Sequence, residues 1–254
     1  MRVTALAVYP LKGGRAMSVE SVEIDDLGPK GDRRYCLVGP GGRAFTQRDD
    51  ANLARVRTMH AESALRLEFD GDTLDVPPDA FTEAIAVRVW SQETTAHAAA
   101  GGVDARLARW FGAPLKLARL AQPLRRNGTA HAFGDAAALL LANAASLDAL
   151  DDALAAPVPM ERFRPNIVVG GAPAYVEDNW GRLRVGDAIL APLHACGRCE
   201  VTTIDQEYGA CLGDEPLRTL SRLRMRGGEP VFGVRYAVER PGTVRVGDAI
   251  EPAG

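Results

Sequence analysis

The sequence lacks the features that mark secreted and membrane-spanning proteins. Its four cysteines among 254 residues are too few for a disulfide framework. No apolar run approaches the ~20 residues that a membrane helix needs. Residues 1–10 are too short and too weakly apolar for a signal peptide. From these absences we expect a cytoplasmic protein with reduced thiols and no membrane contact.

The sequence also lacks an excess of positive charge and the common nucleotide motifs. Thirty Lys and Arg residues oppose thirty-three Asp and Glu residues, for a net charge of −3, so we expect no nucleic-acid partner. There is no G-x-x-x-x-G-K-[ST] phosphate loop, no G-x-G-x-x-G dinucleotide fingerprint and no four-cysteine ferredoxin pattern. Any redox chemistry must therefore receive its electrons from another molecule.

Most of the chain has the pattern of short strands joined by tight turns. The segments 35–38 and 44–47 flank Gly-Pro-Gly-Gly, which predicts a hairpin. Residues 65–69 alternate between apolar and polar side chains before an Asp-Gly pair, which predicts a second hairpin. Many short strands with Gly and Pro turns favour a barrel-like architecture.

A few segments depart from this pattern. Residues 103–111 have helical spacing, and Ser146 is a candidate N-cap for a helix through residues 147–154. The polar stretch 122–132 is predicted to be an exposed loop and a domain boundary. We therefore expect a mainly β protein with some helices (α+β), made of two interlocked β-barrel-like domains at residues 1–115 and 120–254.

Two cysteines in one turn are the strongest indication of chemistry. Cys196 and Cys199 follow a predicted strand at residues 188–193, with a glycine and an arginine between them. A thioredoxin-like dithiol requires a βαβ context, whereas the residues that follow this turn are β-prone. The pair is also compatible with an inert buried pair, or with one thiolate that ligates the metal of a bound cofactor.

A zinc site is a further alternative for the same turn. Thiolates and imidazoles are the usual zinc ligands, but a second closely spaced pair is missing from the sequence. Additional ligands could come from Cys211 and from His194 or Cys36.

Basic residues beside predicted strand ends provide the second indication. Lys12 precedes two glycines, Arg33 and Arg34 follow Gly-Asp, and Arg164 precedes a proline. Single basic residues at such places are usually solvated. Together with a thiolate they suit an anionic ligand that carries phosphate, because guanidinium forks match phosphate oxygens.

Several longer motifs occur in the order seen in a known family. The chain resembles the MOSC proteins (molybdenum cofactor sulfurase C-terminal domain) with an N-terminal β-barrel domain, and is similar to the mitochondrial amidoxime-reducing component and the bacterial YcbX-type proteins. The resemblance extends from Val3 to Ile250. The motifs that carry it include Tyr9-Pro10-Leu11-Lys12, Gly31-Asp32-Arg33-Arg34-Tyr35, Phe163-Arg164-Pro165-Asn166, Cys196-Gly197-Arg198-Cys199 and Thr202-Thr203-Ile204-Asp205.

This resemblance implies a molybdenum–molybdopterin cofactor and a set of residues that hold it. Cys199 matches the cysteine that ligates molybdenum. Gly13 stands where the mitochondrial relatives carry a serine. The positions that match the pterin and phosphate contacts are Lys12, Gly13, Arg34, Asp135, Arg164, Asn166 and Arg198.

The resemblance also implies an activity. We expect reduction of small N-hydroxylated compounds, namely hydroxylamines, amidoximes or N-hydroxylated bases. The electrons would come from a separate donor protein such as a ferredoxin, a flavin reductase or a cytochrome b5-like protein. Asp205 is a candidate proton donor, although a turn-capping role is equally compatible with its position. The alternatives are a non-catalytic carrier of the cofactor or of its sulfur, and a structural zinc protein.

Overall fold

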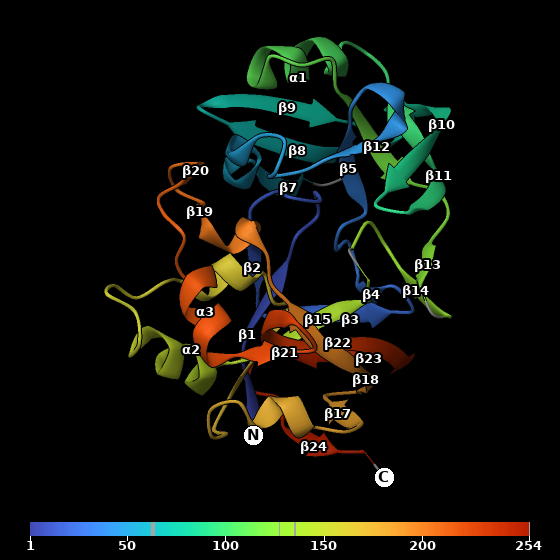
Figure 1. Ribbon diagram of the computed structural model, residues 1–254. Helices are drawn as coiled ribbons and strands as arrows, with labels where there is room; N and C mark the ends of the chain where they lie inside the picture. Colours follow the sequence, from blue (N-terminus) through green and yellow to red (C-terminus); the bar gives the residue numbers. More distant parts are fainter. Residues whose placement is uncertain (62–63, 127, 135, 254) are drawn as a thin grey trace.

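The computed structural model describes residues 1–61, 64–126, 128–134 and 136–253. Strands dominate it, and the described residues contain three α-helices, so the mainly β class predicted from the sequence is confirmed. Figure 1 shows two parts stacked on each other, with both chain termini at the lower end. No helix among the described residues has the length and apolar character needed to cross a bilayer.

The lower part is built on one large sheet with the strand order β2-β1-β16-β15-β22-β18-β17-β24. Its pairs are antiparallel except for β15 with β16. Apolar side chains from one face form its core, including Leu141, Ile167 and Tyr236. The strands are β1 (Arg2–Val8), β2 (Met17–Val19), β15 (Leu139–Asn143), β16 (Ile167–Gly170), β17 (Leu183–Val185), β18 (Ala188–Gly197), β22 (Glu229–Arg240) and β24 (Ile250–Pro252).

The upper part combines two smaller sheets and one helix. One sheet has the order β10-β11-β12-β5-β6, and the other has the order β7-β8-β9. α1 (Val103–Phe111) packs Val103 and Leu107 into the core of these sheets and ends at Gly112. The strands are β5 (Tyr35–Val38), β6 (Ala44–Phe45), β7 (Arg57–Ala61), β8 (Ala64–Phe69), β9 (Asp72–Val76), β10 (Phe81–Val89), β11 (Gln92–Ala99) and β12 (Lys116–Leu120).

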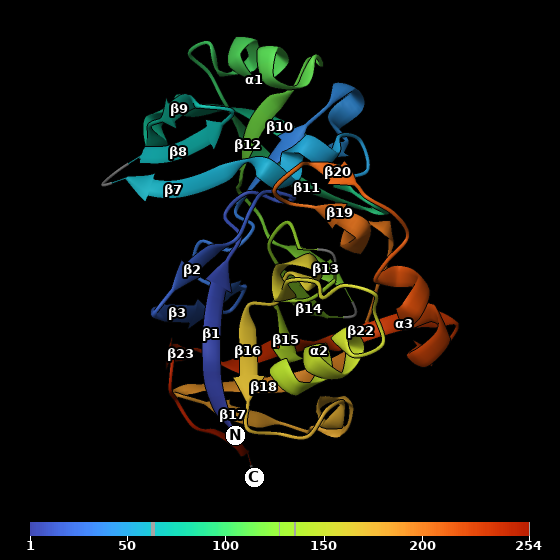
Figure 2. The same cartoon turned by 90° about the vertical axis from the view of Figure 1, so that its left-hand side faces the viewer.

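The two parts are interlocked because the first strands belong to the lower sheet. β1 pairs with β16, and β3 (Ser21–Asp25) pairs with both β4 (Gly28–Pro29) and β23 (Gly242–Arg245). Figure 2 shows β1 running beside β16 through the lower part. The division into domains 1–115 and 120–254 stays a prediction, since the start of the chain is paired with its last third.

Two local expectations are corrected by the structure. Residues 139–143 form the fully buried strand β15, and α2 (Ala144–Asp151) follows directly. Its N-cap is Asn143, whose Oδ1 accepts from Ala145 N at 3.2 Å, while Ser146 Oγ donates to Glu177 Oε1 at 2.6 Å. The buried apolar residues 139–143 form a strand, so the helix begins directly after Asn143. Ser146 therefore lies inside the helix and not at its N-cap.

The stretch 122–132 was predicted to be an exposed loop, but residues 124–126 and 129–131 form strands. It contains the paired strands β13 (Leu124–Arg126) and β14 (Thr129–His131), in which Leu124 and His131 are buried. The remaining elements are β19 (Ile204–Asp205), β20 (Ala210–Cys211), α3 (Leu217–Leu223) and β21 (Met225–Arg226).

Candidate functional site

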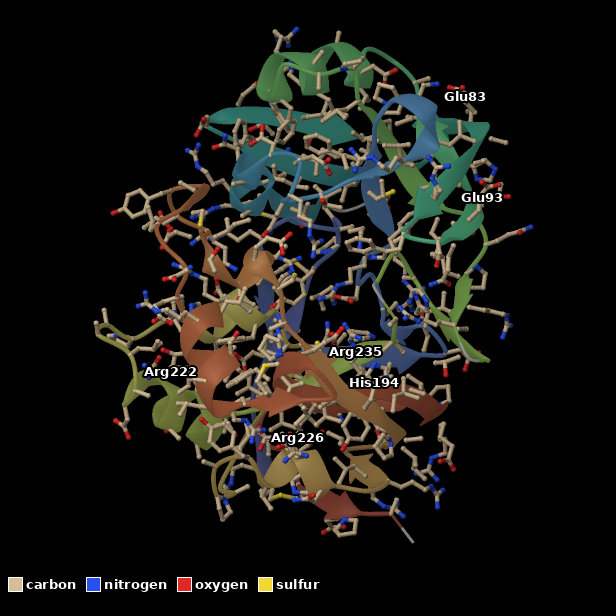
Figure 3. The ribbon with its side chains drawn as sticks, in the orientation of Figure 1. Glu83, Glu93, His194, Arg222, Arg226 and Arg235 are labelled. Carbon is tan, nitrogen blue, oxygen red and sulfur yellow. The ribbon has the colours of Figure 1, made fainter. Side chains whose placement is uncertain are left out.

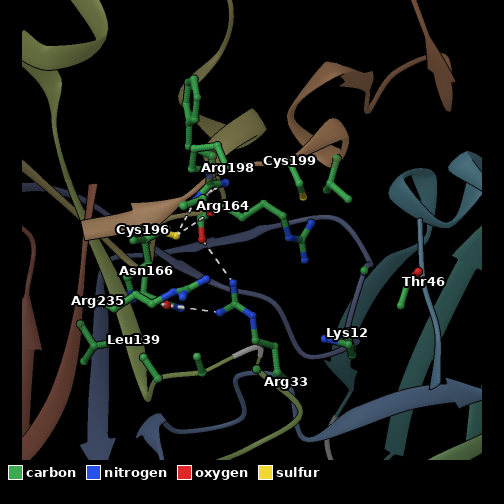
Figure 4. Close-up of a pocket in the computed structure, with 18 of the residues that line it drawn as sticks. Lys12, Arg33, Thr46, Leu139, Arg164, Asn166, Cys196, Arg198, Cys199 and Arg235 are labelled. Atoms are coloured by element: carbon green, nitrogen blue, oxygen red, sulfur yellow. Dashed lines mark hydrogen bonds between the residues drawn. The ribbon is translucent and has the colours of Figure 1, made fainter. Parts of the chain in front are cut away.

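A cavity lies where the two parts meet, and both contribute to its lining. The upper side and the first loop supply Lys12, Gly13, Arg33, Thr46, Gln47, Arg48 and Trp90. The lower part supplies residues after β14, the segment around Arg164 and the turn at the end of β18. Figure 4 shows these side chains around the cavity, with Arg33, Arg164 and Arg235 reaching into it. The cavity therefore brings together residues more than 200 positions apart in the sequence.

The lining is strongly cationic. Lys12 and five arginines line the cavity, whereas none of the described lining residues is an Asp or Glu. Arg33 forms an ion pair with Asp32, and Arg48 forms one with Glu200. Arg198 and Arg235 form no ion pair with the described residues. This charge distribution suits an anion, because guanidinium groups form their strongest hydrogen bonds with phosphate-like oxygens.

Both cysteines of the C-x-x-C turn line the cavity, and each contacts a different arginine. Arg48 Nη2 donates to Cys199 Sγ at 2.8 Å, and Arg198 Nη1 donates to Cys196 Sγ at 2.9 Å. A Cβ added to Gly197, between them, would lie 2.1 Å from Glu229 Oε2, so the Glu229 carboxylate would have to move to admit a larger residue. The turn thus presents two soft sulfur atoms to a cationic cavity.

The zinc alternative finds no support in the arrangement of ligands. Within the described residues, no group of three or more His, Cys, Asp or Glu side chains is placed to hold a metal ion. Cys211 contacts Thr203 Oγ1 at 3.1 Å and donates to Gly213 O at 3.0 Å. Cys36 is fully buried, and burial raises the pKa of its thiol well above the usual range.

Two arginines of the cavity have a backbone conformation that non-glycine residues rarely adopt. The φ angles of Arg33 and Arg164 are +48° and +56°. Their guanidinium carbons lie 4.6 and 4.4 Å from the ring centroid of Tyr9. Such a conformation costs about 1–3 kcal/mol per residue and is concentrated at functional sites. The Tyr9 hydroxyl donates to Pro165 O at 3.1 Å, and burial raises its pKa to about 12.

Asn166 lines the cavity, but its amide is fully used by the protein. Its Nδ2 donates to Ala7 O at 3.1 Å and to Asp32 Oδ1 at 2.9 Å. Its Oδ1 accepts from Leu140 N at 3.1 Å and from Arg33 Nη1 at 3.2 Å. Because two donors and two acceptor positions are all an amide has, Asn166 positions Arg33 and does not bind a ligand directly.

The structure brings together most of the residues predicted to hold the cofactor. Lys12, Gly13, Arg164, Arg198 and Cys199 line the cavity with Asn166. Asp135 lies outside the described residues. Arg34 lies away from the cavity, because its Nη2 donates to both oxygens of Asp25, at 2.7 and 2.8 Å.

Three cationic residues of the lining were not among the cofactor-binding positions that the family resemblance implied. Arg33 was a candidate for anion binding beside Arg34, but the resemblance assigned the cofactor contact to Arg34, and the left-handed turn at Arg33 places Arg33 in the lining instead. Arg48 and Arg235 line the cavity as well. Their sequence context carried no signal, since Arg48 follows a short polar loop and Arg235 lies within a long strand.

Asp205 does not line the cavity and caps a turn instead. Its Oδ1 accepts from the backbone N of Glu207 at 2.8 Å and of Tyr208 at 3.1 Å, and its Oδ2 accepts from Arg162 Nη2 at 2.7 Å. Burial alone would raise the pKa of Asp205, but the two backbone donors and Arg162 outweigh it and lower the pKa. An ionised carboxylate in this position is a poor proton donor, and the turn-capping interpretation is the one the geometry favours.

We therefore expect Asp205→Asn to lower the stability of the fold and to leave the cavity lining intact. The Asp205 carboxyl has a lower pKa in the folded protein than in the unfolded chain, where the pKa is about 3.9. It therefore stabilises the fold at pH values above about 3.9, and this stabilisation is lost as the pH falls through the folded-state pKa. At neutral pH the variant should lose about 1–3 kcal/mol of the free energy of unfolding. Thermal unfolding of the wild-type protein and of Asp205→Asn between pH 7 and pH 3 measures this difference. If the difference in stability between the two proteins grew as the pH fell, the turn-capping role of Asp205 would be contradicted.

Comparison with known proteins identifies the family. Residues 1–116 match the MOSC N-terminal beta barrel domain, and residues 128–251 match the MOSC domain. The mouse mitochondrial amidoxime-reducing component 1 is 30% identical, over 98% of this chain and 81% of that protein. A rice molybdenum cofactor sulfurase is 28% identical, over 92% of this chain and 32% of that protein. A crystal structure of the YUAD protein from Bacillus subtilis covers 98% of this chain and 93% of its own, with 15% identity and a TM-score of 0.47.

The fold and the site together define a class of protein. It is mainly β, and a cationic cavity lined by cysteine thiols lies between its two parts. The chain belongs to the MOSC family and carries the family's N-terminal β-barrel domain.

The comparison with known proteins also contradicts the predicted cytoplasmic location. Relatives from mouse, human and rat are named as mitochondrial proteins, which points to mitochondria and not to the cytoplasm. A low cysteine count argues against a disulfide framework, but it does not distinguish one reducing compartment from another.

The family association with the molybdenum cofactor agrees with the residues of the cavity. The lining combines soft sulfur donors, which suit such a metal, with cations that suit a pterin phosphate. The Nε of Arg198 is buried and has no hydrogen-bond partner among the described residues. A buried donor without a partner costs about 1–3 kcal/mol, which an anionic ligand could recover.

Proposed function

We propose that this protein reduces small N-hydroxylated compounds with a molybdenum–molybdopterin cofactor held in the cavity between its two parts. The observation that carries the proposal is the placement of Cys199 among six cationic side chains of the lining. Support comes from relatives that are named amidoxime-reducing components. The overall reaction takes a hydroxylamine, two electrons and two protons to an amine and water.

The residues of the cavity have separate roles in this proposal. Cys199 would ligate the metal through sulfur, and Lys12, Arg33, Arg164 and Arg198 would hold the anionic pterin and its phosphate. When bound, the cofactor would supply a two-electron redox centre for cleavage of the N–O bond. Asn166 and Asp32 hold Arg33 in its left-handed conformation at the cavity wall.

A carrier function is the second candidate, and one comparison favours it. The match to a molybdenum cofactor sulfurase supports a protein that binds the cofactor for delivery to another enzyme. A carrier would release the cofactor to an acceptor and would show no turnover in the presence of reductant. An enzyme would retain the cofactor through many turnovers.

The electron source provides a direct test of the proposal. No nicotinamide or flavin fingerprint occurs in the sequence, so we expect no reduction of benzamidoxime with NADH alone. Turnover should appear with reduced viologen or with a separate donor protein from the same host. The measurement is amidine formation by molybdenum-loaded protein under each supply. Robust turnover with NADH alone would show that the proposed need for a donor is wrong, and no turnover with any reductant would favour the carrier.

A further inference from the structure

One guanidinium of the upper part reaches across to the turn that carries Cys199. Arg48 follows β6, and its Nη2 donates to Cys199 Sγ at 2.8 Å. Its Nε donates to Glu200 Oε1, next to that cysteine. Its guanidinium carbon lies 4.7 Å from the ring centroid of Trp90. A sulfur, a carboxylate and an aromatic ring therefore fix one cation in place.

The partners of Arg48 are unusual in ways that indicate more than surface packing. Trp90 is 53% exposed and has a φ of +56°, so a large aromatic residue occupies a costly backbone conformation at the protein surface. The Glu200 carboxylate accepts a hydrogen bond from Arg48 Nε while Arg48 Nη2 donates to Cys199 Sγ, so the carboxylate fixes the rotation of the guanidinium that faces the sulfur.

The same contacts connect the two parts of the molecule at the cavity. Arg48 and Trp90 belong to the upper part, whereas Cys199 is the N-cap and Glu200 the first residue of the 3-10 helix η6 (Glu200–Thr203), which follows β18 in the lower part. Cys199 accepts this hydrogen bond from outside its own turn, while Cys196 accepts from Arg198 within the turn. The placement of the Cys199 sulfur thus depends on how the two parts are docked.

We propose that Arg48 is a positioning residue that holds the Cys199 sulfur toward the cavity, with Trp90 and Glu200 orienting the guanidinium. The inference rests on the proposed function in one respect, namely that this sulfur ligates the metal. A planar fork that donates to two acceptors while stacked on a ring is a geometry specific to arginine, and a lysine cannot reproduce it.

The first experiment compares wild-type protein with Arg48→Gln and Arg48→Lys after loading with the molybdenum cofactor. Groups that orient a metal ligand typically contribute 10- to 100-fold to metal affinity, so Arg48→Gln should retain molybdenum about 10-fold less tightly. The electron paramagnetic resonance spectrum of the half-reduced metal should change in both variants, because both lose the fork. Arg66→Gln is the matched control, since Arg66 pairs with Asp75 at the surface of β8, outside the cavity lining.

The second experiment uses cofactor-free protein and does not depend on the proposed activity. Iodoacetamide alkylates a sulfur atom that it can reach, and the guanidinium of Arg48 covers and holds the Cys199 sulfur through a hydrogen bond. Mass spectrometry should show several-fold faster alkylation of Cys199 in Arg48→Gln and in Arg48→Lys, because neither side chain reproduces the fork that holds this sulfur. Alkylation of the exposed Cys211 is the internal reference and should not change.

The outcomes separate the two proposals. Unchanged alkylation of Cys199 in Arg48→Gln would overturn the positioning role, whatever the metal content. Wild-type protein that takes up no molybdenum would overturn the proposed function, while the alkylation rates would still decide the role of Arg48. Equal effects of Arg48→Gln and Arg66→Gln would show a general loss of stability and would also overturn the inference.

Discussion

Cys199→Ser is expected to abolish reduction of N-hydroxylated substrates, with a loss of at least ~100-fold. A neutral hydroxyl is a harder and poorer donor than thiolate for the metal that this cavity suits. The fold should persist, because Cys199 is only partly buried at the end of a turn. The measurements are turnover with reduced viologen, molybdenum content and the absorption spectrum of the loaded protein.

Cys196→Ser is the matched control for this prediction. Cys196 is 4% exposed and accepts a hydrogen bond from Arg198, a role that a serine oxygen can keep. We expect a much smaller loss of turnover and an unchanged metal spectrum. Equal losses in the two variants would instead indicate a dithiol or a site that uses both sulfurs.

Arg164→Ala is expected to release the cofactor from otherwise folded protein. A charge-assisted hydrogen bond contributes about 1.5–3 kcal/mol, which corresponds to about 10- to 150-fold weaker retention. Arg164 is the better choice for this test than Arg33, because removal of Arg33 would also leave the buried Asp32 carboxylate without its ion pair. Pterin fluorescence after gel filtration measures the retained fraction.

Arg34→Ala distinguishes the cavity from its surroundings. Arg34 was a candidate from the sequence, but its guanidinium binds Asp25 and does not line the cavity. Its replacement should leave pterin content unchanged while it removes one partly exposed ion pair. Loss of pterin in Arg34→Ala with full retention in Arg164→Ala would show that the cofactor lies elsewhere.

Charged side chains also lie on several faces of the molecule away from the cavity. Figure 3 shows Arg222 and Arg226 at separate places in the lower part, while Glu83 and Glu93 lie on the right-hand side of the upper part. His194 and Arg235 lie on neighbouring strands, where His194 Nε2 and Arg235 Nη1 are 3.1 Å apart. Burial and the nearby Arg235 lower the pKa of His194, so this contact is present at neutral pH and weakens on acidification.

Local patterns in the sequence were sufficient to predict several elements of the fold. Alternation of apolar residues at 65–69 predicted β8, and helical spacing ending at Gly112 predicted α1. The C-x-x-C turn was recognisable because cysteines are few in this chain, and both of its sulfur atoms do line the cavity. These features depend on neighbours within a few residues, which is the range over which a sequence pattern reports structure.

Only the tertiary structure decided which residues line the cavity. Arg33 and Arg34 are chemically identical neighbours, and a single left-handed φ directs one into the cavity and leaves the other with Asp25. Arg48 reaches Cys199 across 151 positions of sequence, and Asn166 is saturated by partners from three separate segments. Which atoms face a ligand depends on how distant strands dock and on which hydrogen bonds the protein has already satisfied, and neither property is encoded in a local run of residues.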